Sequence, residues 1–206
     1  MQLVQRYSLV LVGLLVLGGI YYLRAGSSRP APPTAGSTII AFGDSLVAGR
    51  GATGGRDFVS LLSRRIGRPI INAGRSGDTS AEALARLDRD VLARDPRVVI
   101  VLLGGNDFLQ KVPREHTFAN LSTIVDRIRQ RGAAVVLVGI NPGMFVDPYG
   151  AAFEDLARRS EAGLVADVLD DILGNGALMS DAIHPNNRGY ELMVDRVEPM
   201  LRILID

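Results

Sequence analysis

The stretch Thr38-Ile39-Ile40-Ala41-Phe42-Gly43-Asp44-Ser45-Leu46 joins an uninterrupted apolar run to a glycine and two polar residues. A short apolar run that stops in this way is typical of a β-strand buried on both faces of a parallel sheet. Ser45 would then lie just beyond the carboxyl end of that strand, where active sites form in sheets of this kind. The stretch therefore predicts both the type of sheet and the place of a candidate nucleophile.

Four more apolar runs follow, and segments with helical periodicity lie between them. The predicted strands are residues 38–42, 69–72, 98–103, 134–140 and 164–168. The predicted helices are residues 57–66, 79–94, 115–131, 148–162 and 186–204. We expect Asp78 or Thr79 to cap the second helix, and Pro199 to kink or end the last one. Such alternation predicts an α/β domain, a three-layer α/β/α sandwich around a five-stranded parallel sheet.

The N-terminal part of the chain has a different composition. Residues 7–23 carry no charge and number 17, close to the minimum of roughly 17–25 that a transmembrane helix needs. We interpret residues 1–24 as a membrane anchor, residues 25–36 as a Pro/Ser/Gly-rich tether and residues 37–206 as the catalytic domain. A cleaved signal sequence is the alternative, although Arg24 makes a poor cleavage site. The domain is expected to be extracytoplasmic (periplasmic), or secreted if the segment is cleaved.

Composition also excludes several classes of function. The formal net charge is +1 and no basic run interleaved with aromatics occurs, so no nucleic-acid partner is expected. Cysteine is absent and only His116 and His184 are histidines, so neither a metal site nor another cofactor is expected. The segment Gly49-Arg50-Gly51-Ala52-Thr53-Gly54 matches a dinucleotide-binding pattern. It does not open a helix directly after a strand, however, and a nucleotide oxidoreductase is not favoured.

A serine nucleophile needs a base to accept its proton, and the base needs a carboxylate to hold its tautomer. His184 and Asp181 stand together in Asp181-Ala182-Ile183-His184-Pro185, far along the chain from Ser45. The other histidine, His116, resembles an exposed residue in the first turn of a helix. Asp44 is expected to brace the loop before Ser45 rather than to take part in chemistry. The three residue types predict a serine hydrolase.

Polar residues also follow the second and third predicted strands, in Asn72-Ala73-Gly74-Arg75-Ser76-Gly77-Asp78-Thr79 and in Gly104-Gly105-Asn106-Asp107. Because the carboxyl ends of parallel strands meet at one edge of a sheet, these segments are expected beside Ser45. Arg75, Phe108 and Leu109 flank the expected site. We interpret these three as candidate substrate-binding residues.

Taken together, Gly43-Asp44-Ser45-Leu46, Ser76-Gly77-Asp78-Thr79, Gly104-Gly105-Asn106-Asp107 and the segment from Asp181 to Pro185 resemble the four sequence blocks of the GDSL-type, or SGNH, hydrolases. The resemblance spans residues 38 to about 200. Residues 72–87 and 96–107 are most similar to the bacterial thioesterase I, arylesterase and lysophospholipase branch. The resemblance implies a flavodoxin-like sandwich and a serine esterase that acts on acyl esters, thioesters or lipids without metal or cofactor.

The resemblance also implies a role for each matched residue. Ser45 would be the nucleophile, His184 the base and Asp181 the acid that orients it. The oxyanion hole would consist of the backbone N–H groups of Ser45 and Gly77 and the side-chain amide of Asn106. Two alternatives stay open: a carbohydrate O-acetylesterase of the same superfamily, and a catalytically inactive, membrane-tethered binding module.

Overall fold

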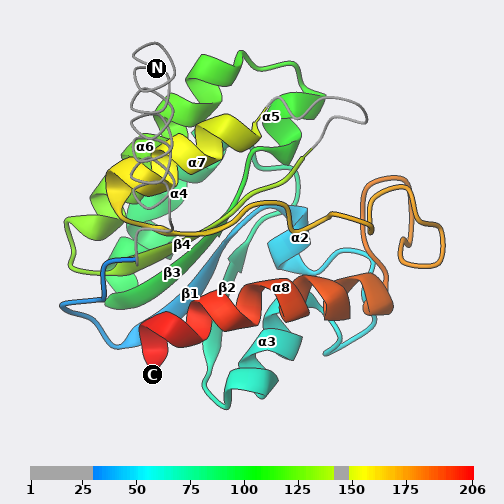
Figure 1. Cartoon of the computed structure of the whole chain (residues 1–206), viewed down its shortest axis with the longest axis horizontal. Helices are drawn as coiled ribbons and strands as arrows, with labels where there is room; N and C mark the ends of the chain where they lie inside the picture. Colours follow the sequence, from blue (N-terminus) through cyan, green and yellow to red (C-terminus); the bar gives the residue numbers. More distant parts are fainter. Residues whose placement is uncertain (1–29, 142–148) are drawn as a thin grey trace, which may run out of the picture.

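A parallel sheet forms the centre of the computed structural model, which describes residues 30–141 and 149–206 (Figure 1). Its strands are β1 (Thr38–Gly43), β2 (Ile70–Gly74), β3 (Pro96–Leu102), β4 (Ala134–Val138) and β5 (Gly163–Val165). The strand order is β2-β1-β3-β4-β5 and every neighbouring pair is parallel. This is the order of flavodoxin-like sheets, and the predicted five-stranded parallel sheet is confirmed.

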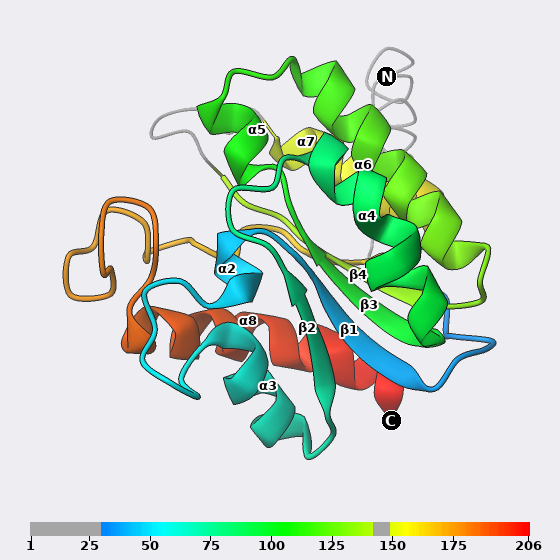
Figure 2. The same cartoon turned by 180° about the vertical axis from the view of Figure 1, so that it is seen from behind.

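Helices cover both faces of this sheet. They are α2 (Ser45–Ala48), α3 (Phe58–Ile66), α4 (Ser80–Asp90), the 3₁₀ helix η1 (Leu92–Arg94), α5 (Gly105–Leu109), α6 (Arg114–Arg129), α7 (Gly150–Ser160) and α8 (Asn187–Ile205). Helices α3 and α8 lie on one face, and α4, α6 and α7 lie on the other, as Figures 1 and 2 show from opposite sides. The three predicted layers are therefore present.

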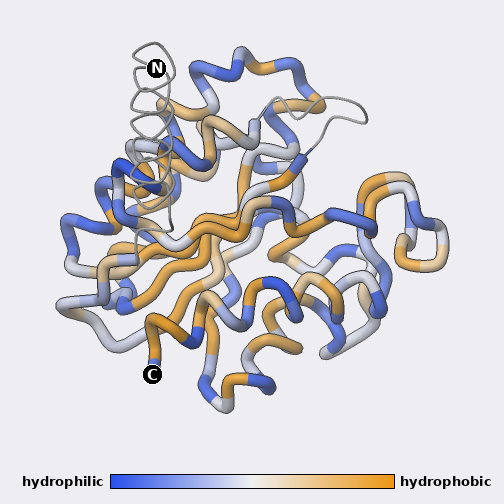
Figure 3. Tube along the Cα trace, in the orientation of Figure 1, coloured by the Kyte–Doolittle hydropathy of each residue, from blue (hydrophilic) through white to orange (hydrophobic). Residues whose placement is uncertain are grey.

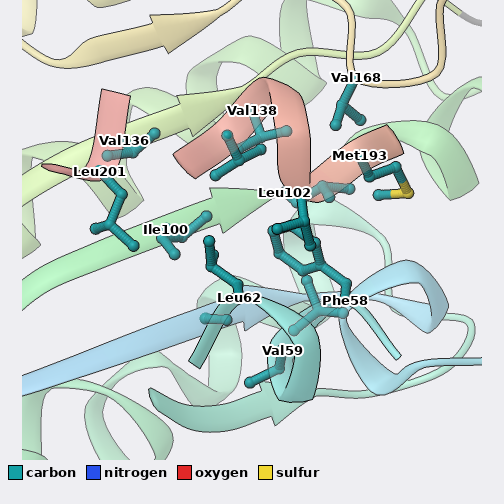
Figure 4. Packing of buried hydrophobic residues seen from close by; sticks show 14 of the residues in the cluster. Phe58, Val59, Leu62, Ile100, Leu102, Val136, Val138, Val168, Met193 and Leu201 are labelled. Carbon is teal, nitrogen blue, oxygen red and sulfur yellow. The ribbon is translucent and has the colours of Figure 1, made fainter. Parts of the chain in front are cut away.

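The strands are apolar on both faces because both faces are covered. Ile39 and Ala41 of β1 belong to the core on the α3/α8 side, whereas Ile40 and Phe42 belong to the core on the α4/α6/α7 side. Figure 3 shows the resulting hydrophobic centre of the molecule. In Figure 4, side chains of α3 and α8 pack against β3 and β4, which places one core between those elements. Burial of this kind contributes about 25 cal/mol for each Å² of apolar surface.

Several element boundaries differ from those expected. Helix α8 continues to Ile205 without ending at Pro199, because Leu201 and Leu204 beyond the proline are still buried in the core. The predicted helix over residues 79–94 is divided into α4 and η1. Thr79 caps α4 through a capping box with Glu82, as predicted.

Two short helices, α2 and α5, were not predicted at all. They contain four and five residues respectively. Segments of that length are too short to show the helical period of 3.6 residues, so periodicity gives no signal for them. Both begin just beyond a strand, α2 after β1 and α5 after β3, and they carry Ser45 and Asn106.

The predicted anchor, residues 1–24, lies outside the described residues. Of the predicted tether, residues 30–36 are described, and they lie against the domain. The Ala31 N–H donates to Glu161 O (2.9 Å) and the Thr34 N–H donates to Gly132 O (2.8 Å). Gly132 and Glu161 precede β4 and β5, so the chain enters the domain at the amino ends of the strands. Within the described parts of the chain, no helix combines the length and apolar character needed to cross a membrane.

Candidate active site

Ser45 lies where the strand order of the sheet reverses. From β1 the chain passes to β2 on one side and then to β3 on the other, which opens a crevice at the carboxyl ends of β1 and β3. Ser45 begins α2 immediately after β1, and Asp44 caps that helix by accepting a hydrogen bond from the Leu46 N–H (Oδ1–N 2.9 Å). A Cβ at Gly43 would lie 2.3 Å from Leu102 O, so this turn requires glycine.

Ser45, His184 and Asp181 form a hydrogen-bonded chain. His184 Nε2 is 3.0 Å from Ser45 Oγ, across 139 positions of sequence. His184 Nδ1 is 2.8 Å from Asp181 Oδ2. With Nδ1–H directed at the carboxylate, the neutral ring presents Nε2 as an acceptor to the serine hydroxyl.

Asp181 holds its charge by local hydrogen bonds. Its Oδ1 accepts from the backbone N–H groups of Ile183 (2.9 Å) and His184 (2.8 Å). The bond from Ile183 and that from the His184 ring lower the pKa of Asp181 to about 2. The residue is also exposed to solvent, and its carboxylate is therefore ionised at any pH near neutrality.

The glycine-rich segment, residues 49–54, supports the histidine loop. A Cβ at Gly51 would lie 2.4 Å from Pro185 O and 2.2 Å from Ser180 Oγ, so the two segments approach closely. The Ser180 N–H also donates to His184 O (2.8 Å). These contacts explain Gly51 of the dinucleotide-like pattern by its packing against the His184 loop.

Asn106 and the Gly77 loop lie together at the next strand ends. Asn106 Nδ2 donates to Asp78 O (2.9 Å). Gly77 is exposed and has φ +89°, a left-handed conformation that favours glycine. The loop is joined to the turn before Ser45 by a hydrogen bond from the Arg75 N–H to Gly43 O (3.0 Å). The structure thus brings the second and third predicted polar segments to the Ser45 edge of the sheet.

Three carboxylates are buried behind this edge: Asp44, Asp78 and Asp107. Burial, with smaller contributions from Asp78 and Asp107, raises the pKa of Asp44 from 3.8 to about 7, although the Leu46 N–H opposes the shift. Asp44 Oδ2 lies 3.4 Å from Asn106 Nδ2. Its contacts are with the α2 cap and Asn106, which fits the bracing role expected for it.

A cavity of about 120 Å³ opens beside Ser45 and His184. Its lining is mostly apolar and comes from five separate segments, with Leu46, Phe108, Leu109, Ile140, Leu169, Leu173 and Ile183 as its large apolar residues. Of the three predicted substrate-binding residues, Phe108 and Leu109 line it. Arg75 does not: its side chain is largely exposed and lies 3.5 Å from the Asp78 carboxylate. His116 is exposed in the first turn of α6.

Leu46 belongs to the motif around Ser45 but was not predicted to line the cavity. Four further apolar lining residues, Ile140, Leu169, Leu173 and Ile183, were not predicted either. They lie on loops beyond β4 and β5, where no periodic pattern marks them. The short separation of Ile183 from His184 was the one available signal. In residues 30–141 and 149–206, no group of three or more His, Cys, Asp or Glu side chains is placed to hold a metal ion.

Comparison with known proteins gave consistent results. The family described as "GDSL-like Lipase/Acylhydrolase family" matches residues 41–192. "Esterase TesA" of Pseudomonas aeruginosa is 31% identical over 182 residues, which are 83% of this chain and 90% of that protein. "Thioesterase 1/protease 1/lysophospholipase L1" of Escherichia coli is 29% identical over 180 residues, covering 84% and 86% of the two chains. A crystal structure of TesA superposes with a TM-score of 0.77 at 30% identity, covering 82% of this chain and 100% of that one.

Proposed function

Because this chain belongs to the GDSL-like lipase/acylhydrolase family, we propose that it hydrolyses its esters through an acyl intermediate on Ser45. The chain is a serine esterase. The observation that carries the residue assignment is the 3.0 Å contact between His184 Nε2 and Ser45 Oγ. An inactive binding module is not favoured, since this contact and the ionised Asp181 supply what a nucleophilic serine needs.

In the first half-reaction, Ser45 Oγ bonds to the acyl carbon while its proton passes to His184 Nε2. Asp181 stabilises the resulting imidazolium through Nδ1–H. When the tetrahedral intermediate collapses, the bond to the leaving oxygen or sulfur breaks and His184 gives the proton to that atom. In the second half-reaction, water repeats the attack with His184 as base, which releases the acid and restores Ser45.

The negative charge on the carbonyl oxygen needs donors that are already in place. We assign them to the backbone N–H groups of Ser45 and Gly77 and to Asn106 Nδ2. The exposure and left-handed backbone of Gly77 and the position of the Asn106 amide against Asp78 O support this assignment. A side chain at position 77 would be strained at this φ.

The apolar cavity supports an acyl chain longer than acetyl as the preferred group. Phe108 and Leu109, at its mouth, are 37% and 55% exposed, and we propose that both contact the acyl chain. An acetyl group would leave most of this apolar lining in contact with water, which disfavours the carbohydrate O-acetylesterase. The name of the Escherichia coli relative of this chain adds thioesters and lysophospholipids to the candidate substrates.

A chain-length series tests this proposal. We expect kcat/KM for p-nitrophenyl esters to rise from the acetyl ester to esters of medium-length chains, because each buried CH₂ contributes about 0.8 kcal/mol. Lysophospholipid, an acyl thioester and an acetylated sugar would be assayed beside the series. A maximum at the acetyl ester, together with turnover of the acetylated sugar, would contradict the assignment of the cavity to an acyl chain.

We also propose that residues 1–24 anchor the chain in a membrane through their uncharged segment, with the domain on the extracytoplasmic side. The intact chain is then expected to sediment with membranes and to require detergent for release. A chain beginning at residue 30, which keeps the contacts of Ala31 and Thr34, should remain in the supernatant.

Digestion of the domain by protease added to spheroplasts would support the outward orientation, whereas protection until lysis would reverse it. A mature N-terminus near Ala25 would identify a cleaved signal sequence instead.

A further inference from the structure

Arg86 of α4 is buried, with 6% of its side chain exposed. A buried guanidinium is tolerated only where its donors are satisfied and its charge is paired. Its Nε donates to the Asp78 carboxylate. Its Nη1 donates to Ala73 O and its Nη2 to Gly43 O, both at 2.9 Å. One planar group therefore contacts three separate points behind the active site, a carboxylate and two backbone carbonyls.

Each of those points leads directly to one of the proposed oxyanion donors. Gly43 O is at the end of β1, two residues before Ser45. Ala73 O is near the end of β2, where the Gly77 loop begins, and Asp78 is the residue after Gly77. The carbonyl of the same Asp78 accepts the hydrogen bond from Asn106 Nδ2 (2.9 Å).

Two more contacts fix the guanidinium itself. Its Nη1 lies 3.1 Å from the Asp90 carboxylate, one turn further along α4. Its Cζ lies 4.5 Å from the centre of the Phe42 ring, which is within the range of a cation–π contact. Phe42 is fully buried. The side chain is thus held by two carboxylates, an aromatic ring and two strand-end carbonyls.

We propose that Arg86 is a positioning residue that holds the three oxyanion donors in one arrangement. The proposal rests on the roles assigned above to Ser45, Gly77 and Asn106. Oxyanion donors lower the barrier because they are oriented before charge develops, and a displacement of about 1 Å costs on the order of a hundredfold in rate. Arg86 contacts neither the cavity nor Ser45 Oγ, so its effect must pass through the donors.

Lysine cannot replace this group. An ammonium presents its donors from one nitrogen, whereas the guanidinium reaches Gly43 O, Ala73 O and Asp78 from three nitrogens in a fixed plane. Arg86→Lys keeps the charge that pairs with Asp78 but releases at least one strand-end carbonyl. We expect kcat to fall about tenfold or more while KM changes less than about threefold, because the donors contact charge that is present mainly in the transition state.

The decisive measurement is a double-mutant cycle with Asn106→Ala. If Arg86 acts through the oxyanion donors, Arg86→Lys should lower kcat less in the Asn106→Ala background than in the wild type, because one of the three donors that it positions is already missing. Arg127→Lys is the matched control: Arg127 pairs with Asp88, an exposed residue of α4 that is not among the partners of Arg86. It should leave kcat unchanged.

Three results would overturn the proposal: an unchanged kcat in folded Arg86→Lys, a change confined to KM, or a loss of kcat that multiplies in full with that of Asn106→Ala. If Arg86 had a merely structural role, Arg86→Lys would lower the midpoint of thermal unfolding without a fall in kcat that depends on Asn106. Should Arg86→Lys fail to fold, Asp78→Asn removes the ion pair between the Arg86 Nε and the carboxylate that follows Gly77. It leaves the arginine and its two carbonyl contacts in place and is judged by the same three criteria. Failure of the proposed function would appear separately, as activity retained by a variant without Ser45.

Discussion

Replacing Ser45 with alanine is expected to lower kcat for ester hydrolysis by about 10⁴-fold or more while leaving the domain folded. Alanine cannot form the covalent bond to the acyl carbon. The hydroxyl makes its hydrogen bond with His184 Nε2, and the backbone carbonyl of residue 45, which accepts from Gly49 and Arg50, is unaffected. The measurement is kcat with a p-nitrophenyl ester, with folding followed by circular dichroism.

Ser63→Ala provides the matched control. Ser63 belongs to α3 and donates to Arg68 O, away from the cavity, and its loss should leave turnover unchanged. A fluorophosphonate probe should label the wild-type chain and Ser63→Ala but not Ser45→Ala. Near-normal turnover by folded Ser45→Ala, or labelling of that variant, would show that another residue is the nucleophile.

Asn106→Ala is expected to lower kcat by about a hundredfold or more, equivalent to about 3 kcal/mol of transition-state stabilisation, with a smaller change in KM. The amide of Asn106 is already held by Asp78 O at 2.9 Å, so in the wild type it needs little rearrangement when charge develops. The measurement is the separate determination of kcat and KM across one ester series.

The control for this variant is Asn120→Ala. Asn120 Nδ2 donates to Ser80 Oγ (3.0 Å), and Ser80 in turn binds the buried Asp107. It is therefore an amide close to the same polar network that does not line the cavity. Its replacement should change kcat by less than about threefold, because its amide does not line the cavity. A change in Asn106→Ala that is confined to KM would instead make Asn106 a ground-state binding residue.

The fold could be predicted from local patterns to a large extent. Apolar runs that stop at glycine and polar residues identified all five strands, and helical periodicity identified the five longer helices, because both signals arise from which side chains must be buried. Local patterns did not decide whether Pro199 ends the last helix. Helix α8 passes Pro199 since the burial of Leu201 and Leu204 outweighs the loss of one backbone hydrogen bond.

The candidate site divides in the same way. Ser45, Asp181, His184, Gly77 and Asn106 could be named from short motifs, because residue type and local order carry their chemistry; their roles stay predictions until the variants are measured. Arg75 was named by its neighbourhood alone, and its exposed side chain does not line the cavity. Proximity in sequence to a site residue does not fix the direction in which a side chain points.

The sequence by itself determined the class of sheet and pointed to Ser45, His184 and Asp181 as the candidate nucleophile, base and acid, since each of these depends on a stretch of a few residues. Only the tertiary structure decided that β1 lies between β2 and β3, that Ser45 Oγ and His184 Nε2 meet across 139 positions, and that loops after β4 and β5 complete the apolar cavity. It alone placed Arg86 against the ends of two strands. These contacts join segments that are distant along the chain, and they exist only because the packing of both cores fixes where every strand ends.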